Sequence, residues 1–182
     1  MQRTHATSHE ASATIDAAAA SARTQWLVCA LGGTEYGLDV TRVQQIIGLL
    51  PITRVPRMPA AVRGVINLRG RVIPVIDLRV RFGLEAVDHG QRTCIIVVQT
   101  GETDLGLVVD GVAEVVHLDA AAIEDAPHFG DNVDTDHLIG VAKHGERVLL
   151  LLDVDRTLPA EAALALNGVA VQPDGSTGPQ PA

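Results

Sequence analysis

An internal repeat constrains the fold of this chain more than any other feature. Residues 26–47 align without a gap on residues 95–116, and residues 64–78 align on residues 140–154. The alignment pairs Gly37 with Gly106, Gly64 with Gly140, and Asp77 with Asp153. Two Val-rich segments could align by chance, but the order of the short apolar runs and Gly-containing turns repeats as well. We therefore predict a mainly β fold built from two similar small antiparallel sheets, each closed into a five-stranded barrel.

The folded body is predicted to span residues 25–158. The repeat places a first barrel at about 25–90 and a second at about 91–158, and it leaves open an exchange of strands between them. Residues 1–24 are rich in Ala, Ser and Thr and read as a flexible extension. Two segments read as helical: one after Asp119, and a short C-terminal helix at 159–167. The Gly- and Pro-rich residues 168–182 read as a disordered tail.

Composition excludes several classes of function. The net charge of −8 disfavours a protein that binds nucleic acid unspecifically, and the 2% aromatic content leaves few platforms for stacking bases. No apolar run approaches the roughly 20 residues that cross a bilayer, and no signal peptide is recognisable. We expect a cytoplasmic, soluble protein that meets a membrane only through a partner.

The charges are divided unevenly along the chain. Residues 42–92 hold nine Arg against three acids, whereas residues 93–142 hold ten acids and no Lys or Arg. Such segments can be ordinary solvated loops. Together they also suit a protein that docks with partners of different charge, or with copies of itself in an array.

The signatures of catalysis and of cofactor binding are weak. No phosphate-binding loop or nucleophile elbow occurs, and the two cysteines lack the spacing of a zinc site. Asp153 and Asp155 lie two apart on a predicted strand and could serve a metal-dependent enzyme. His117, His128 and His137 lie among acids, but their spacing defines no common face. We expect no catalytic residues, no metal and no cofactor.

The segment 62–79 is the most informative. It reads as a hairpin whose turn, Asn67 to Gly70, calls for a positive φ at Gly70. Four arginines surround this hairpin: Arg63, Arg69, Arg71 and Arg79. They could protect an edge strand, pair with carboxylates, or form the basis of a nucleic-acid-binding double barrel.

The same segment carries a family resemblance. The run RGVINLRGRVIPVIDLRVRFG strongly resembles the signature of the chemotaxis coupling protein CheW family, and EYGLDVTRVQQIIG, LGLVVDGVAEVV, APHF and RVLLLLDVDRTL resemble other family segments in the same order. The resemblance implies two SH3-like barrels that share an apolar interface. It also implies a non-catalytic adaptor that links transmembrane chemoreceptors to the regulatory domain of the histidine kinase CheA. A coupling protein of a paralogous pathway, such as twitching motility or surface sensing, is the alternative.

The resemblance also assigns roles to residues of this chain. It implies a groove for the helical hairpin tip of a methyl-accepting chemoreceptor, with the site residues Val43, Gly64, Asn67, Arg69 and Val115. It implies kinase-binding residues at Gln45, Ile46 and Phe129. Phe129 also lies between Pro127 and Gly130 in an acidic loop, which suits an exposed anchor. The family often has Glu where Gln45 stands, so a charge pair with the kinase or with Arg69 is in question.

Overall fold

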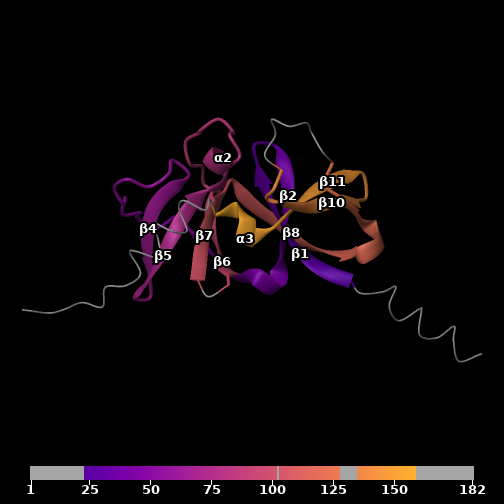
Figure 1. Cartoon of the computed structure of the whole chain (residues 1–182), viewed down its shortest axis with the longest axis horizontal. Coiled ribbons are helices and arrows are strands. Elements are labelled where there is room, and N and C mark those ends of the chain that lie inside the picture. Colours follow the sequence, from indigo (N-terminus) through magenta and orange to yellow (C-terminus); the bar gives the residue numbers. More distant parts are fainter. Residues whose placement is uncertain (1–22, 102, 128–134, 159–182) are drawn as a thin grey trace, which may run out of the picture.

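A computed structural model describes residues 23–101, 103–127 and 135–158, which form two β-sheets side by side (Figure 1). The strands are β1 (Arg23–Leu31), β2 (Thr34–Asp39), β3 (Val43–Gly48), β4 (Val62–Leu68), β5 (Arg71–Asp77), β6 (Cys94–Thr100), β7 (Thr103–Val109), β8 (Gly111–Asp119), β9 (Ile123–Asp125), β10 (Leu138–His144) and β11 (Arg147–Leu152). Three short helical segments lie between strands, η1 (Val40–Arg42), α2 (Leu78–Arg81) and η2 (Ala120–Ala122), and a fourth, α3 (Val154–Thr157), follows β11. The mainly β, two-sheet fold is confirmed.

Each sheet contains a hairpin from the other half of the sequence. The six-stranded sheet has the order β8-β1-β2-β11-β10-β9, and the five-stranded sheet has the order β3-β6-β7-β5-β4. The β1–β2 hairpin therefore belongs with β8 to β11, and the β6–β7 hairpin belongs with β3 to β5. Sheet membership does not coincide with the segments 25–90 and 91–158, and strands are exchanged between the two copies.

The exchanged hairpins are attached in the same way in both sheets. β2 pairs in parallel with β11, and β7 pairs in parallel with β5, whereas the other described pairings are antiparallel. Arg71, at the start of β5, forms an ion pair with Asp104 of β7. Arg147 and Glu35, their equivalents in the repeat, lie 3.1 Å apart between β11 and β2. The same ion pair thus joins each host sheet to its exchanged hairpin.

The hydrogen bonds of the two copies confirm the repeat. The amide of Asp77 donates to the carbonyl of Ala61 at 2.8 Å, and the amide of Asp153 donates to the carbonyl of His137 at the same distance. Asp77 caps α2 and Asp153 caps α3 through their side chains. A register shift occurs before Gly64 in β4 and before Gly140 in β10.

Three apolar clusters hold the fold together. One fills the six-stranded sheet and one fills the five-stranded sheet, while the largest, here the central cluster, draws side chains from both. Leu27 and Leu38 of one sheet meet Ile96 and Leu107 of the other in this cluster, and each is fully or nearly fully buried. Burial of one such side chain contributes about 1.5–3 kcal/mol, so the shared cluster makes the two sheets one unit.

The predicted helices are borne out only in part. The segment after Asp119 forms the single turn η2 and then strand β9, and the Asp119 side chain makes no capping hydrogen bond. It pairs instead with Arg23 of β1 at 3.0 Å. The extension 1–22, the predicted helix at 159–167 and the tail lie outside the described residues. Within the described part of the chain, no helix is long and apolar enough to cross a membrane.

Candidate functional site

The tip of the β4–β5 hairpin is a two-residue turn formed by Arg69 and Gly70. Both have positive φ, 51° for Arg69 and 83° for Gly70, as a type I′ turn requires. The side chain of Asn67 accepts a hydrogen bond from the amide of Gly70 at 2.8 Å and fixes the turn. The expected positive φ at Gly70 is confirmed, and Arg69 was not expected to share it.

Arg69 occupies a backbone position better suited to glycine. Its equivalent in the second copy is Gly145, which has a φ of 63° at the tip of the β10–β11 hairpin. A side chain in this conformation costs roughly 1 kcal/mol or more. Arg69 is exposed, and among the described residues it forms no ion pair or side-chain hydrogen bond. The fold therefore does not need this guanidinium.

Gly64 is buried within the chain rather than displayed on its surface. Its φ is 140°, and a Cβ placed on it would lie 2.0 Å from the carbonyl oxygen of Thr53. The missing side chain admits the backbone of residues 53 and 54 across β4, where Thr53 and Val65 exchange two hydrogen bonds of 2.9 Å. Any influence of Gly64 on a partner would act through the position of this crossing segment.

The strands β3 and β8 present equivalent apolar side chains. Val43, at the start of β3, and Val112 of β8 both pack against the central cluster. Three residues further along each strand, Ile46 is 45% exposed and Val115 is 46% exposed. These side chains continue the shared apolar interior onto the surface, which is an arrangement that can receive an apolar helix face.

The remaining predicted site residues are placed differently. Gln45 is half-buried in β3 opposite Val97. Phe129 lies outside the described residues. The exposed apolar side chains that the sequence did not single out include Val72 of β5, at 64%, and Val148 of β11, at 52%. They are equivalent positions of the repeat, so the alignment itself contained the signal that could have found them.

Part of the charge division along the sequence is neutralised inside the structure. The basic residues Arg71 and Arg79 pair with Asp104 and Asp110 of the acidic segment. The Arg79 guanidinium donates to both carboxylate oxygens of Asp110 at 2.6 Å and holds the pKa of that carboxyl below its usual value. The uneven charge of the two segments therefore serves folding as well as the surface.

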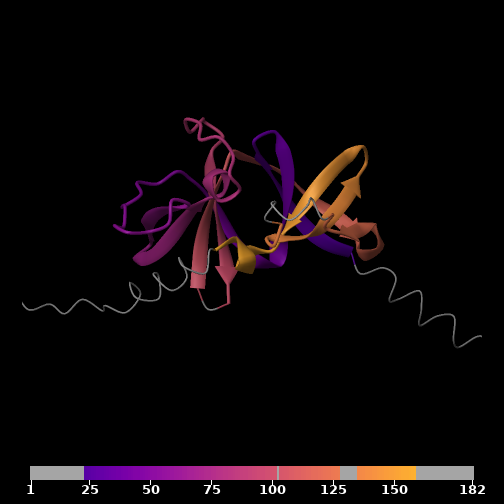
Figure 2. The ribbon, with the colours of Figure 1, turned by 45° about the horizontal axis from the view of Figure 1, so that its top comes forward.

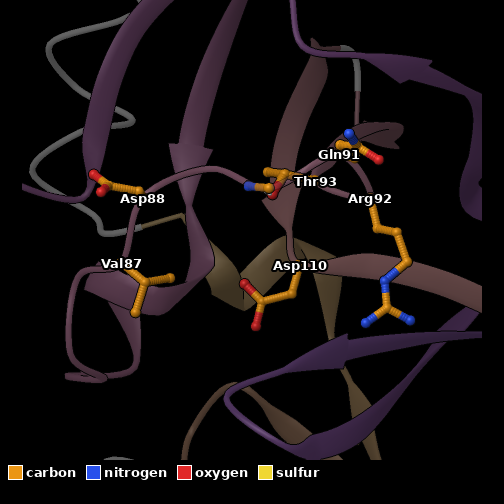
Figure 3. A pocket seen from close by; sticks show the side chains of 7 residues that line it. Val87, Asp88, Gln91, Arg92, Thr93 and Asp110 are labelled. Carbon is orange, nitrogen blue, oxygen red and sulfur yellow. Dashed lines mark hydrogen bonds between the residues drawn. The ribbon is translucent and has the colours of Figure 1, made fainter.

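Asp110 borders a surface cavity of about 500 Å³ that is also lined by the loop 87–93 (Figure 3). The loop contributes a carboxylate from Asp88 and a guanidinium from Arg92. The Asp110 carboxylate is already engaged by Arg79 and by the amide of Gly32 at 2.9 Å. An ionised carboxylate with a low pKa and these partners is poorly suited to act as a general base.

The residues of the enzyme hypothesis are engaged in structural contacts. Asp153 follows β11 rather than lying on it, and it accepts a hydrogen bond from the amide of Asp155 at 3.0 Å. Asp155 pairs with Arg42. The two aspartates do not share a strand face, so the basis of the enzyme hypothesis is wrong.

The histidines are also engaged. His117 lies 2.9 Å from the side-chain amide of Gln25, and His137 stacks on Phe82 with a centroid distance of 4.2 Å. The described residues contain no group of three potential ligands that could hold a metal ion.

Comparisons with known proteins agree with this architecture. The family model for the CheW-like domain matches residues 25–162. The chain is 40% identical over 146 residues to the chemotaxis protein CheW of Klebsiella aerogenes, and the match covers 80% of this chain and 88% of that protein. It is 33% identical over 131 residues to CheW of Rhizobium meliloti, covering 72% and 84% of the two chains. It is also 30% identical over 130 residues to the protein FrzA of Myxococcus xanthus, covering 70% of this chain and 81% of that one.

The solved structures give the same result. The crystal structure of the scaffolding protein TtCheW from Thermoanaerobacter tengcongensis superposes with a TM-score of 0.72 at 32% sequence identity, covering 77% of this chain and 95% of that one. The family model, the first relative and the structural match each span more than two thirds of the chain. The chain therefore belongs to the CheW family of chemotaxis coupling proteins and is a non-catalytic scaffolding adaptor of chemotaxis signalling.

Proposed function

We propose that this adaptor couples the cytoplasmic hairpin tips of methyl-accepting chemoreceptors to the regulatory domain of the histidine kinase CheA. Its place is the cytoplasm, where receptor clusters recruit it to the membrane. The observation that carries the proposal is Arg69, an exposed arginine that occupies a glycine-like backbone position and has no partner in the described chain. A costly residue that the fold does not use is best explained by contact with another molecule.

The receptor contact is assigned to Val43, Gly64, Asn67, Arg69 and Val115. Val43 and Val115 supply an apolar surface that continues the central cluster, and Arg69 supplies a charged group at the hairpin tip. Gly64 acts by holding the crossing segment against β4. Helix docking in such a groove draws on apolar burial, with charge pairs at the rim setting orientation.

The kinase contact is assigned to Gln45, Ile46 and Phe129. Ile46 is an exposed aliphatic side chain on β3, a strand at the end of its sheet. The Gln45 amide can hydrogen-bond across an interface but cannot form the ion pair that Glu would form. We expect each interface to be weak alone and to gain strength through several attachments in an array.

Co-sedimentation tests this proposal directly. Membranes that contain chemoreceptors are mixed with purified CheA and the full chain, and the bound adaptor and kinase activity are measured. We expect Arg69→Glu to abolish kinase recruitment by the receptors, whereas Arg92→Glu, at another exposed arginine, leaves it unchanged. Wild-type recruitment by Arg69→Glu would contradict the proposal.

The similarity to FrzA keeps a paralogous chemosensory pathway as the second candidate. The two candidates share the fold and the surfaces and differ in the receptors and the kinase that they serve. To distinguish the two, the chain is co-sedimented with the kinase and receptors encoded beside its own gene. It is then co-sedimented with those encoded in other chemosensory gene clusters of the same genome.

A further inference from the structure

The loop 49–61 joins β3 to β4 at the outer end of the five-stranded sheet (Figures 1 and 2). It is fixed to the sheet at both ends. Thr53 exchanges two 2.9 Å hydrogen bonds with Val65 of β4, and the amide of Val62 donates to the carbonyl of Pro59 at 2.9 Å. Because Gly64 has no side chain, the backbone of Arg54 lies directly over β4. The loop is therefore held in one place despite its lack of regular structure.

A cavity of about 230 Å³ lies between this loop and β4. Its lining combines two arginines with apolar or small residues: Arg54, Arg63, Val55, Met58, Pro59, Ala60 and Val62. None of the described residues that line it is acidic. The chemical character of the cavity is therefore cationic and apolar at once, and we call it the Arg54/Arg63 cavity.

Within the described chain, one of the two guanidinium groups has no partner and the other forms a single long ion pair. Arg54 is exposed and makes no ion pair or side-chain hydrogen bond there. Arg63 reaches the Oδ2 atom of Asp77 only at 3.9 Å. The other carboxylate oxygen of Asp77 accepts the amides of Arg79 and Val80, at 3.0 and 3.4 Å, and so serves the cap of α2. Two like charges on one cavity repel each other unless an anion lies between them.

The second copy of the repeat shows that the fold does not require these arginines. There, the strand β9 takes the place of the crossing segment, and Glu124 and Asp125 pair with Val141 and Gly140 of β10. The equivalent of Arg63 is Ile139, which is half-exposed. The same backbone arrangement is thus built with acids and an isoleucine in one copy and with two arginines in the other.

The loop also contains a strained residue. Arg57 has a φ of 63°, a left-handed conformation that costs free energy in any residue other than glycine. Strain of this kind persists where the surrounding structure fixes the backbone, and it concentrates at binding sites. Arg57 adds a second positive charge to a loop whose conformation is already set.

We propose that the Arg54/Arg63 cavity binds a carboxylate side chain of an acidic peptide segment in a partner protein. The guanidinium groups pair with the carboxylate, and Val55, Met58 and Val62 receive an aliphatic side chain next to it in the peptide. This contact is a further one, although its cavity shares the crossing segment with the receptor surface proposed above, because Gly64 admits the backbone of Arg54 over β4. The test below omits receptor and kinase, so its failure is distinguishable from failure of the proposed function.

The test is a nuclear magnetic resonance titration of the full chain, without receptor or kinase. The probe is the peptide acetyl-Ser-Leu-Glu-Glu-Leu-Ser-amide, and the matched control peptide has Gln in place of both Glu. We expect the Glu peptide to shift the backbone amide signals of Arg54, Val55 and Ala60. Arg54→Gln should raise the dissociation constant about fivefold or more, because it removes one charge-assisted contact. Arg92→Gln, an exposed arginine elsewhere on the surface, should change it less than about twofold.

The outcomes separate the proposal from its alternatives. Equal binding of the Gln peptide, wild-type binding by Arg54→Gln, signals that shift only elsewhere, or no shift at millimolar peptide would each overturn it. Inorganic phosphate, titrated at equal ionic strength, should bind more weakly than the Glu peptide, and tighter binding of phosphate would also overturn it. Arg54 has no partner among the described residues, so its variant keeps the test valid if Arg63→Gln fails to fold.

Discussion

Arg79 and Asp110 join the two sheets through a bidentate ion pair, with both nitrogen–oxygen distances at 2.6 Å. Arg79 belongs to α2, which follows β5, and Asp110 lies where the chain passes from β7 to β8. The Asp110 carboxylate also accepts the amide of Gly32 from the β1–β2 turn. Three segments that are distant in the sequence therefore meet at one carboxylate.

The other crossing between the two sheets has a corresponding pair with the charges exchanged. Arg42 lies where the chain passes from β2 to β3, and it pairs with Asp155 of α3. Each crossing between the sheets is thus tied to a short helix by one Arg–Asp pair. The side chains of Arg42 and Asp155 are 35% and 55% exposed, against 17% and 29% for Arg79 and Asp110. Solvent screens the first pair more strongly.

Asp110→Asn is expected to lower the free energy of unfolding by about 1–2 kcal/mol at pH 7, because it removes charge-assisted hydrogen bonds from a partly buried site. Arg79 lowers the pKa of Asp110 in the folded state, so the stabilisation is present above the unfolded value of 3.8 and is lost as the pH falls through the folded value. Urea unfolding at pH 7 and at about pH 2.5 measures this. The difference between variant and wild type should shrink in acid.

Asp155→Asn is the matched control for this prediction. Its pair is more exposed, so the loss should stay below about 1 kcal/mol at pH 7. Equal losses for the two variants would show that burial does not set the strength of these pairs.

Arg69→Gly is expected to separate stability from function. Glycine relieves the positive φ at the hairpin tip, as Gly145 does in the second copy, so the free energy of unfolding should rise or stay within about 1 kcal/mol of wild type. Binding to receptors should fall, because a guanidinium that has no partner among the described residues is lost. Chemical denaturation and co-sedimentation of the same preparation measure the two effects. A variant that loses stability and binding together would indicate a structural role for Arg69.

The repeat made much of the fold predictable, and it left the exchange of hairpins undecided. The aligned Asp positions mark helix caps, which local backbone chemistry determines. The aligned Gly positions lie inside strands, at points where a neighbouring group approaches too closely for a side chain. Which sheet receives the β1–β2 hairpin depends on parallel pairing between β2 and β11, and such long-range contacts have no signal in local patterning. The strands β3 and β8 did not stand out as apolar runs, because Gln45 and Glu114 interrupt them at exposed or half-buried positions.

The candidate site was predictable in its residues but less so in their roles. The resemblance placed Gly64 in the groove for a partner helix. In the structure, the group next to it is the Thr53 carbonyl of its own chain. The free-energy cost of Arg69 comes from its positive φ. The sequence of the turn predicts a positive φ for Gly70 but not for the arginine beside it. The Arg54/Arg63 cavity arises where the loop 49–61 crosses β4. The path of an irregular loop across a strand has no pattern in the sequence that would predict it.

Gly64→Ala is expected to destabilise the chain by about 3 kcal/mol or more, because the new Cβ would overlap the carbonyl group of Thr53. Gly140→Ala should behave similarly, with 2.5 Å to the carbonyl oxygen of Glu124. Gly48→Ala meets nothing within 4 Å and serves as the control with a small effect. Thermal unfolding measures all three, and a mild effect of Gly64→Ala would mean that the crossing segment moves away easily.

Ile46→Ser and Val115→Ser are expected to leave the free energy of unfolding within about 1 kcal/mol of wild type, since each side chain is nearly half exposed. If these residues serve different partners, Ile46→Ser weakens binding to the kinase regulatory domain, and Val115→Ser weakens binding to receptors. Separate titrations with each purified partner test this. Equal losses toward both partners would argue for one shared surface, and Val87→Ser, at another exposed valine, is the control.

Cys29 gives the fold a sensitivity to alkaline pH. It is fully buried in the central cluster, and this burial raises its pKa to about 12 from 9.0. The folded state thus favours the neutral thiol, so its contribution is fully present below pH 9 and is lost as the pH rises toward 12. For one thiol, the loss amounts to about 1.4 kcal/mol at pH 10.

The free energy of unfolding of wild type should therefore fall more between pH 8 and pH 10 than that of Cys29→Ala, by about this amount. Cys94→Ala, at a half-buried thiol whose pKa burial also raises, should retain most of the wild-type pH dependence. Identical pH dependence in wild type and Cys29→Ala would show that the thiol ionises without unfolding.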